Sequence, residues 1–173
     1  MDTRERLIKG NLLYLAGGGG TIRERLAREG QKPYAIVVCC SDSRVIPEHI
    51  FHADIGELFV IRVAGNVLDR HQLGSIEYAA EHLGSRLVVI LGHTGCGAVA
   101  AALSGHADGF ISGITDEIRS AIGTERDPDL ACRKNVLYGV GTVRNAFAGH
   151  PAFTDTEVIG AVYDIAAGTV EWL

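Results

Sequence analysis

The chain of 173 residues is long enough to bury one apolar core, and its composition, 47% hydrophobic and 21% charged without an apolar run of about 18 residues, excludes a membrane-spanning protein. A formal net charge of -5 without a block of lysine and arginine argues against a nucleic-acid partner, because such binding needs many cationic contacts to phosphate. The first residues lead into no apolar segment of the signal-peptide type, so we expect a soluble, cytoplasmic protein.

The first thirty residues predict a helical arm. Apolar residues recur near helical spacing over residues 3–15, and four glycines at 17–20 then predict a flexible connector. A short charged helix follows over residues 22–29, with Thr21 as its N-cap and Gly30 at its end. We expect this arm, residues 1–30, to pack either on a partner subunit or on its own domain.

The middle of the chain alternates strands with helices. Apolar β-formers predict strands over residues 34–40, 58–63 and 86–91, and apolar residues three and four apart predict a helix over 72–83. Pro47 starts a helical turn after the first strand. Residues 92–97 are expected to form a turn, and a further helix begins at Ala98.

The last third predicts two more helices and a terminal hairpin. Isoleucines at helical spacing indicate a helix within 105–127, and Pro128 starts a longer helix that runs to about Phe147. Residues 158–165 read as a strand, followed by a turn at 167–168 and a terminal strand over 169–173. We therefore predict one α/β domain over residues 1–173, with a mainly parallel sheet of about four to five strands and flanking helices.

Two polar runs each follow a predicted buried strand. The first is CSDSR at residues 40–44, and the second is HTGC at residues 93–96. The carboxyl ends of parallel strands are where α/β sheets bind ligands, and two thiols, an imidazole and a carboxylate form a donor set that zinc selects. The sequence therefore predicts a catalytic zinc site.

The four cysteines, with no export signal, are expected to bind metal, act in catalysis or pack, and not to form disulfides. Cys39 and Cys40 are adjacent and should point to opposite faces of a strand end, so only one of them faces the site. Cys96 lies at the start of a predicted helix, where the helix dipole favours the thiolate. We expect Cys132 to be ordinary core packing.

Taken together, these motifs resemble the β-class carbonic anhydrases. The resemblance covers CSDSRV at 40–45, the Pro-Glu pair at 47–48, AGN at 64–66, GHTGCGAV at 92–99 and GAVYDI at 160–165. It implies zinc, one ion per chain, with Cys40, His93 and Cys96 as fixed ligands. The resemblance selects Cys40 over Cys39, because the family's ligand stands two residues before the aspartate.

The resemblance also implies roles for the neighbouring residues. Asp42 would be either the fourth zinc ligand or the partner of the zinc-bound water, with Arg44 as its salt-bridge partner. Gln31 and Gly97 are the expected substrate-binding positions, and Gly95 and Gly97 should also allow a tight turn and close helix packing. Position 37 is Val where members with an inhibitory bicarbonate site carry Trp, so we expect that site to be absent. A homodimer or higher even-numbered assembly is implied.

The chemistry expected is attack of zinc hydroxide on CO₂, which gives bicarbonate and a proton. Arg44 would hold Asp42 off the metal, so activity should rise with pH. The other histidines, at 49, 52, 71, 82, 106 and 150, are candidates for a proton shuttle, although each is expected to be an ordinary surface residue.

Three alternatives remain open. The same zinc site would serve a hydrolase of carbonyl sulfide or carbon disulfide. A hydrolase using Cys96 as its nucleophile would need no metal. A non-catalytic zinc protein would keep Asp42 permanently on the ion.

Overall fold

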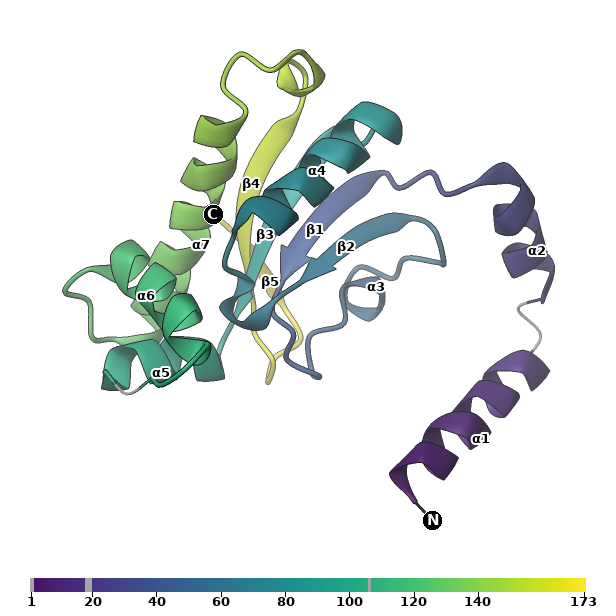
Figure 1. The fold of residues 1–173 in the computed structure, drawn as a ribbon, viewed down its shortest axis with the longest axis horizontal. Coiled ribbons are helices and arrows are strands. Elements are labelled where there is room, and N and C mark those ends of the chain that lie inside the picture. Colours follow the sequence, from purple (N-terminus) through teal and green to yellow (C-terminus); the bar gives the residue numbers. More distant parts are fainter. Residues whose placement is uncertain (1, 18–19, 106) are drawn as a thin grey trace. The chain divides into compact units, whose positions relative to one another are not determined.

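The computed structural model describes residues 2–17, 20–105 and 107–173 and divides the chain into two units, Met1–Gln31 and Lys32–Leu173. The first unit holds helices α1 (Thr3–Ala16) and α2 (Gly20–Glu29), as shown in Figure 1. The helix predicted over residues 3–15 is confirmed. Gly20 opens α2, so the prediction that Thr21 caps this helix is wrong, and the middle two glycines of the connector, 18 and 19, lie outside the described residues.

The second unit is built on a five-stranded sheet of order β2-β1-β3-β4-β5. The four longer strands run parallel, and β5 is antiparallel to β4, so the predicted α/β class and terminal hairpin are confirmed. The strands are β1 (Ala35–Cys39), β2 (Leu58–Arg62), β3 (Leu87–His93), β4 (Glu157–Tyr163) and β5 (Val170–Trp172).

Strand β3 is longer than predicted. Gly92 and His93 pair with Val162 and Tyr163 of β4, so both residues belong to the strand and not to the turn. The sequence prediction ended the strand at Leu91 because a glycine followed by a polar residue is typical of a turn. His93 is therefore held by the sheet, through its pairing with Tyr163.

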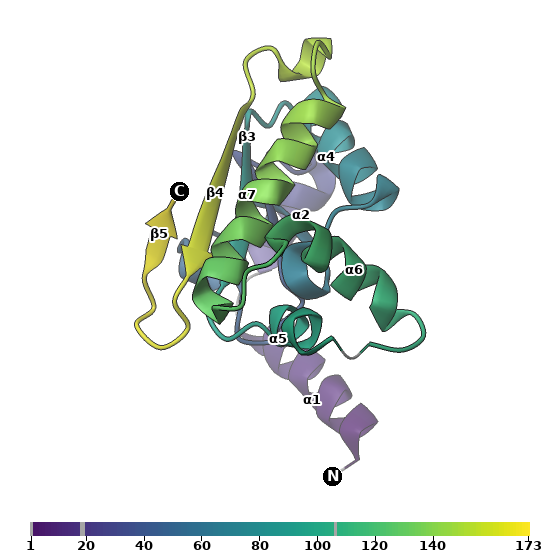
Figure 2. The ribbon, with the colours of Figure 1, turned by 90° about the vertical axis from the view of Figure 1, so that its left-hand side faces the viewer.

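The two faces of the sheet bury alternate residues of each strand. Ile36 and Val38 of β1 face α4 (Arg70–His82) and α7 (Pro128–Ala146), which lie on the same side of the sheet in Figures 1 and 2. Val37 and Cys39 face the opposite side, next to the short helix α3 (Pro47–Ile50). Cys40 follows the end of β1 and lies on the opposite face from Cys39, where it packs in a third cluster with Cys96.

Helices α5 (Gly97–Ser104) and α6 (Ile111–Ile122) complete this third cluster with Val99, Ala102 and Ile118. Two short 3₁₀ turns, η1 (Ala64–Asn66) and η2 (Pro151–Phe153), connect the longer elements. None of the described helices combines the length and the apolar character needed to cross a membrane.

Candidate metal centre

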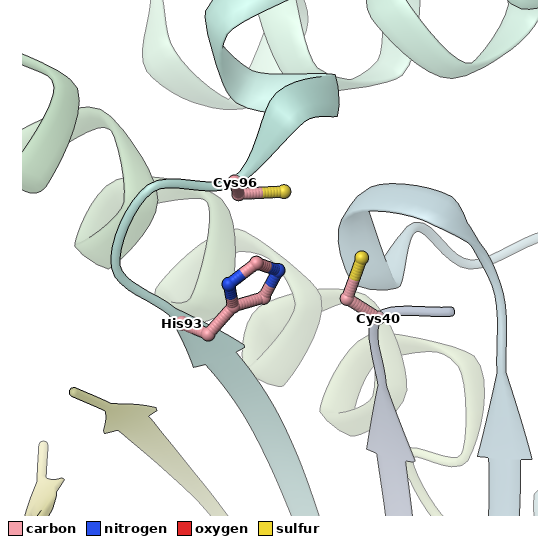
Figure 3. A group of neighbouring side chains, drawn as sticks. All are labelled: Cys40, His93 and Cys96. Atoms are coloured by element: carbon pink, nitrogen blue, oxygen red, sulfur yellow. The ribbon is translucent and has the colours of Figure 1, made fainter. Parts of the chain in front are cut away.

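Three predicted ligands converge at the carboxyl ends of β1 and β3, which are neighbours in the sheet. Cys40 follows β1 directly, His93 is the last residue of β3, and Cys96 is the N-cap of α5. Their ligand atoms all lie within 4.8 Å of one another, and Figure 3 shows the three side chains pointing toward a common point. The side chains are almost fully buried, with exposed fractions of 5%, 0% and 6% in chain order.

The imidazole of His93 is oriented as a metal ligand would be. Its Nδ1 lies 2.9 Å from the carbonyl oxygen of Thr94, and a carbonyl oxygen only accepts, so Nδ1 carries the proton. The other ring nitrogen, Nε2, is buried and has no hydrogen-bond partner among the described residues. A buried lone pair without a donor is costly unless something binds it, and a metal ion fits this need.

The two thiols of the group have opposite acid–base behaviour. The pKa of Cys40 is lowered, chiefly because Cys96 donates a hydrogen bond to its sulfur, and burial opposes this shift. The backbone N–H groups of Gly65 and Asp42, 3.3 and 3.4 Å from the sulfur, lower it further. The same thiol-to-thiolate bond, together with burial, raises the pKa of Cys96. A divalent ion would take the place of this shared proton.

Cys39 and Cys132 lie outside this group. Burial raises the pKa of Cys39 to about 12 and that of Cys132 to about 11, so both are thiols at neutral pH. The packing role expected for Cys132 fits its burial, but the thiol also donates a hydrogen bond to the carbonyl oxygen of His93 at 3.2 Å. No local pattern predicts this contact, because the two residues are 39 positions apart.

Asp42 is bound to Arg44 and is not among the three clustered ligands. The guanidinium donates from Nε to Oδ1 at 2.9 Å and from Nη2 to Oδ2 at 2.7 Å, and the Arg44 backbone N–H also reaches Oδ1 at 3.0 Å. These hydrogen bonds from Arg44 lower the pKa of Asp42 well below its usual range, so the carboxylate is charged at neutral pH. This bidentate pair fixes the direction of the carboxylate.

Arg62 is a residue that the sequence analysis did not identify. Its Nη2 donates to the backbone carbonyl of Asp42 at 2.7 Å, which fixes the loop after β1. The feature of the sequence that could have pointed to Arg62 is its charge at the end of the otherwise apolar strand LFVIR.

The two predicted substrate-binding residues are not tested by this geometry. Gln31 belongs to the first unit of the chain, and Gly97 is the first residue of α5. A Cβ added to Gly97 would meet nothing within 4 Å, so the expected close helix packing at this position is wrong. Gly95 has φ +66°, which agrees with the tight turn expected before Cys96.

A second group of possible ligands, Glu77, Glu81 and His150, lies between α4 and η2. The His150 Nδ1 accepts the backbone N–H of Ala152 at 3.3 Å, so the proton is on Nε2, which lies 3.4 and 3.5 Å from the two carboxylates. No lone pair of the imidazole is directed at the carboxylates, so this group does not have the geometry of a metal site. Among the other histidines considered as shuttles, His106 lies outside the described residues.

Comparisons with known proteins agree with this geometry. The family model described as carbonic anhydrase matches residues 35–170. Carbonic anhydrase 2 of Mycobacterium tuberculosis is 52% identical over 84 residues, which cover 49% of this chain and 41% of that protein. The chain thus spans less than half of that relative. The carbonic anhydrase of Mycolicibacterium smegmatis is 34% identical over 180 residues, covering 94% of this chain and 87% of that protein.

Solved structures give the same result for the fold. The β-carbonic anhydrase CcaA superposes with a TM-score of 0.83 at 26% identity, covering 99% of this chain and 95% of that one. A tetrameric β-carbonic anhydrase from Sordaria macrospora superposes with a TM-score of 0.82 at 27% identity, covering 100% of this chain and 98% of that one.

Proposed function

This chain belongs to the β-class carbonic anhydrase family, and from that membership we propose that it holds one zinc ion at Cys40, His93 and Cys96 and catalyses the reversible hydration of CO₂ to bicarbonate. One observation carries the proposal. The buried Nε2 of His93 has no partner among the described residues, and it lies within 4.8 Å of the sulfurs of Cys40 and Cys96.

The ligand set favours zinc over other divalent ions. Two thiolates and one imidazole suit a borderline-soft ion with tetrahedral geometry, and three protein ligands leave one position open, as in catalytic zinc sites. When bound, zinc acts as a Lewis acid that lowers the pKa of water and supplies hydroxide as a nucleophile near neutral pH.

The protein side chains orient the reactants around this position. Arg44 occupies both oxygens of Asp42, which keeps the carboxylate from closing the site as a fourth ligand. Oδ1 accepts two hydrogen bonds from Arg44, whereas Oδ2 accepts one, so Oδ2 retains a lone pair that can accept a hydrogen bond from the nucleophile and direct it. Thr94 fixes the His93 tautomer through Nδ1, and the burial of the group limits competition from bulk water.

The alternatives are less well supported. The relatives and structures found are carbonic anhydrases by name, which gives no support to a carbonyl sulfide hydrolase or a non-catalytic protein. A cysteine nucleophile must be a thiolate, whereas the pKa of Cys96 is raised by its hydrogen bond to Cys40 and by burial.

We also propose a homodimer or an even-numbered assembly of dimers. No residue of α1 is buried, although this helix carries several leucines with more than half of their surface exposed. A single helix of 14 residues is marginal in water without tertiary packing. A partner surface from a second copy would supply that packing.

The direct test is stopped-flow CO₂ hydration on protein of measured zinc content. We expect about one zinc per chain, and we expect Asp42→Asn and Arg44→Ala to keep the zinc while turnover falls by roughly 100-fold, the scale of lost orientation in an active site. Zinc-loaded, folded wild-type protein without CO₂ hydration would reject the enzyme proposal. Loss of zinc in either variant would instead make that residue part of the metal site.

A further inference from the structure

Helix α7 bonds to the backbone of the candidate ligand His93 and to the backbone of Gly65, whose N–H contacts the candidate ligand Cys40. Its residues Cys132 and Asn135 are three apart, so they lie on one face of the helix, and both are buried. The Cys132 thiol donates to the carbonyl of His93 at 3.2 Å, and the Asn135 Nδ2 donates to the carbonyl of Gly65 at 2.9 Å. Neither residue is a candidate ligand, yet each bonds to a residue at the site.

Gly65 is the link between Asn135 and the ligand Cys40. Its backbone N–H lies 3.3 Å from the Cys40 sulfur, while its carbonyl receives the Asn135 amide. Its φ of +69° is in the left-handed region, and a Cβ here would lie 2.8 Å from Cδ1 of Ile118. The two groups belong to neighbouring peptide planes that meet at the Gly65 Cα, so the bond from Asn135 restrains the position of this Cα and of the N–H attached next to it.

The close packing of α7 on β3 determines how far the side chains of Cys132 and Asn135 must reach to contact the backbone at the site. A Cβ on Gly92, the residue before His93, would lie 2.5 Å from Cγ2 of Val136 and 3.0 Å from the Cys132 sulfur. Helix and strand are therefore as close as a glycine permits, and this distance allows the short Cys132 side chain to reach the His93 carbonyl.

Burying the amide of Asn135 costs free energy of folding at this position. The neighbouring buried residues of α7 are apolar, among them Val136, Val140 and Val143. A buried amide costs free energy unless it is bonded, and an apolar residue would stabilise this face without that requirement. Because its described bond goes to Gly65, the amide is best explained by what it does for that backbone.

We propose that Asn135 is a positioning residue for the metal centre. It holds Gly65 so that the Gly65 N–H bonds to the Cys40 thiolate, and this bond sets the electron density on the sulfur and the affinity of the site for its metal ion. The inference rests on the proposed zinc site. Cys132 assists by anchoring His93, but a thiol is a weak donor, so Asn135 carries the larger effect.

The experiment compares cobalt(II) binding by wild-type, Asn135→Ala and Asn135→Asp protein, because cobalt reports on its thiolate ligands by absorption. We expect the affinity for cobalt, and for zinc by competition, to fall by roughly 10-fold in both variants, as for other residues that hold a metal ligand in place. The thiolate-to-cobalt charge-transfer band should move to longer wavelength, because a thiolate that has lost an N–H donor gives up an electron more easily.

Thr115→Val is the matched control. Thr115 is fully buried, and its hydroxyl donates to the carbonyls of Ile111 and Ser112 in its own helix and to none of the candidate ligands. The control should lose stability while its cobalt affinity and spectrum match those of the wild type.

The outcomes separate this inference from the proposed function. Wild-type protein that takes up no metal would end the proposed function and this inference with it. Normal metal binding by the wild type, with an unchanged spectrum and affinity in both Asn135 variants, would overturn this inference alone. Failure of both variants to fold would overturn it as well, because Asn135 would then serve the fold and not the site.

Discussion

At the scale of single residues, Cys39 and Cys40 are adjacent but differ in chemistry. Cys39 is the last residue of β1 and is fully buried against Val37 and Leu91, where burial raises its pKa to about 12. Cys40 faces the other way, and its sulfur receives two backbone N–H groups. The difference follows from strand alternation, because one face surrounds Cys39 with apolar side chains and the other provides N–H donors to Cys40.

We predict that Cys40→Ala loses the bound metal, whereas Cys39→Ala keeps about one ion per chain. The reason is that only Cys40 lies within 4.8 Å of the other two ligand atoms. Cys39→Ala should cost about 1 kcal/mol of stability from lost packing, measured by urea unfolding. Metal content by atomic emission is the readout, and metal retained in Cys40→Ala would mean that the ion binds elsewhere.

The convergence of Cys40, His93 and Cys96 could be predicted from the sequence because each of these candidate ligands lies in a short motif directly after an apolar strand. Cys40 and Asp42 follow β1, and His93 and Cys96 lie three residues apart at the end of β3. The supporting contacts could not be predicted in this way. Asn135 and Gly65 are 70 positions apart, and their pairing depends on how closely α7 packs on the sheet, which no local pattern records.

At the scale of elements, the contact between α7 and β3 depends on Gly92. We predict that Gly92→Ala destabilises the fold by about 1–3 kcal/mol, because the new methyl group would lie 2.5 Å from Val136 and the helix would have to move outward. The same displacement should weaken metal binding, since His93 is the next residue. Urea unfolding and metal titration measure the two effects.

Gly141→Ala is the matched control within α7. A Cβ at this position meets nothing within 4 Å, so alanine should stabilise the helix by about 0.5–1 kcal/mol and leave metal binding unchanged. Equal effects of the two substitutions would show that the close contact at Gly92 does not determine the packing of α7.

The connection between α6 and α7 supplies a pH-dependent contribution to stability. Glu125 accepts from Lys134 at 2.9 Å and from the backbone N–H groups of Arg126 and Asp127 at 2.9 and 3.1 Å. Lys134 is the largest cause, and the pKa of Glu125 falls from 4.5 to about 2. A carboxyl group with a lowered folded-state pKa stabilises the fold above its unfolded pKa, and the contribution is lost as the pH falls.

We predict that Glu125→Gln is less stable than the wild type near neutral pH and that the difference disappears between pH 4.5 and about 2. Comparing the two proteins cancels the titration of all shared groups, including the cysteine ligands. Thermal unfolding at a series of pH values provides the measurement. Lys134→Met should reproduce most of the effect, and a difference that persists unchanged to pH 2 would contradict this account.

Element boundaries show where local patterns are overruled by packing. The helices with apolar residues at regular spacing, α1, α4, α6 and α7, occur close to their predicted positions. The end of β3 was misjudged because Gly92 and His93 have turn-like character, yet pairing with Val162 and Tyr163 keeps them in the sheet. Neighbouring strands decide this, and they lie about 70 residues away in the chain.

At the scale of the whole molecule, α1 has no buried residue but carries five leucine and isoleucine side chains that are each more than half exposed. Their exposed fractions are Leu7 73%, Ile8 54%, Leu12 61%, Leu13 64% and Leu15 53%. Such a concentration of apolar surface marks an interaction site. A sequence pattern can indicate a helix of this kind, but it does not identify the surface that covers it.

We predict that the protein is a dimer or a multiple of dimers and that the double substitution Ile8→Ser/Leu12→Ser shifts it toward the monomer. These residues are four apart and lie on one face of α1, so both changes remove apolar area from the same surface. Sedimentation velocity over a range of concentrations measures the shift. Arg6→Ser, on the other side of the helix, is the control and should leave the assembly intact. If wild type and both variants sediment alike as monomers, α1 does not hold two copies together; if all three remain dimers, another surface does.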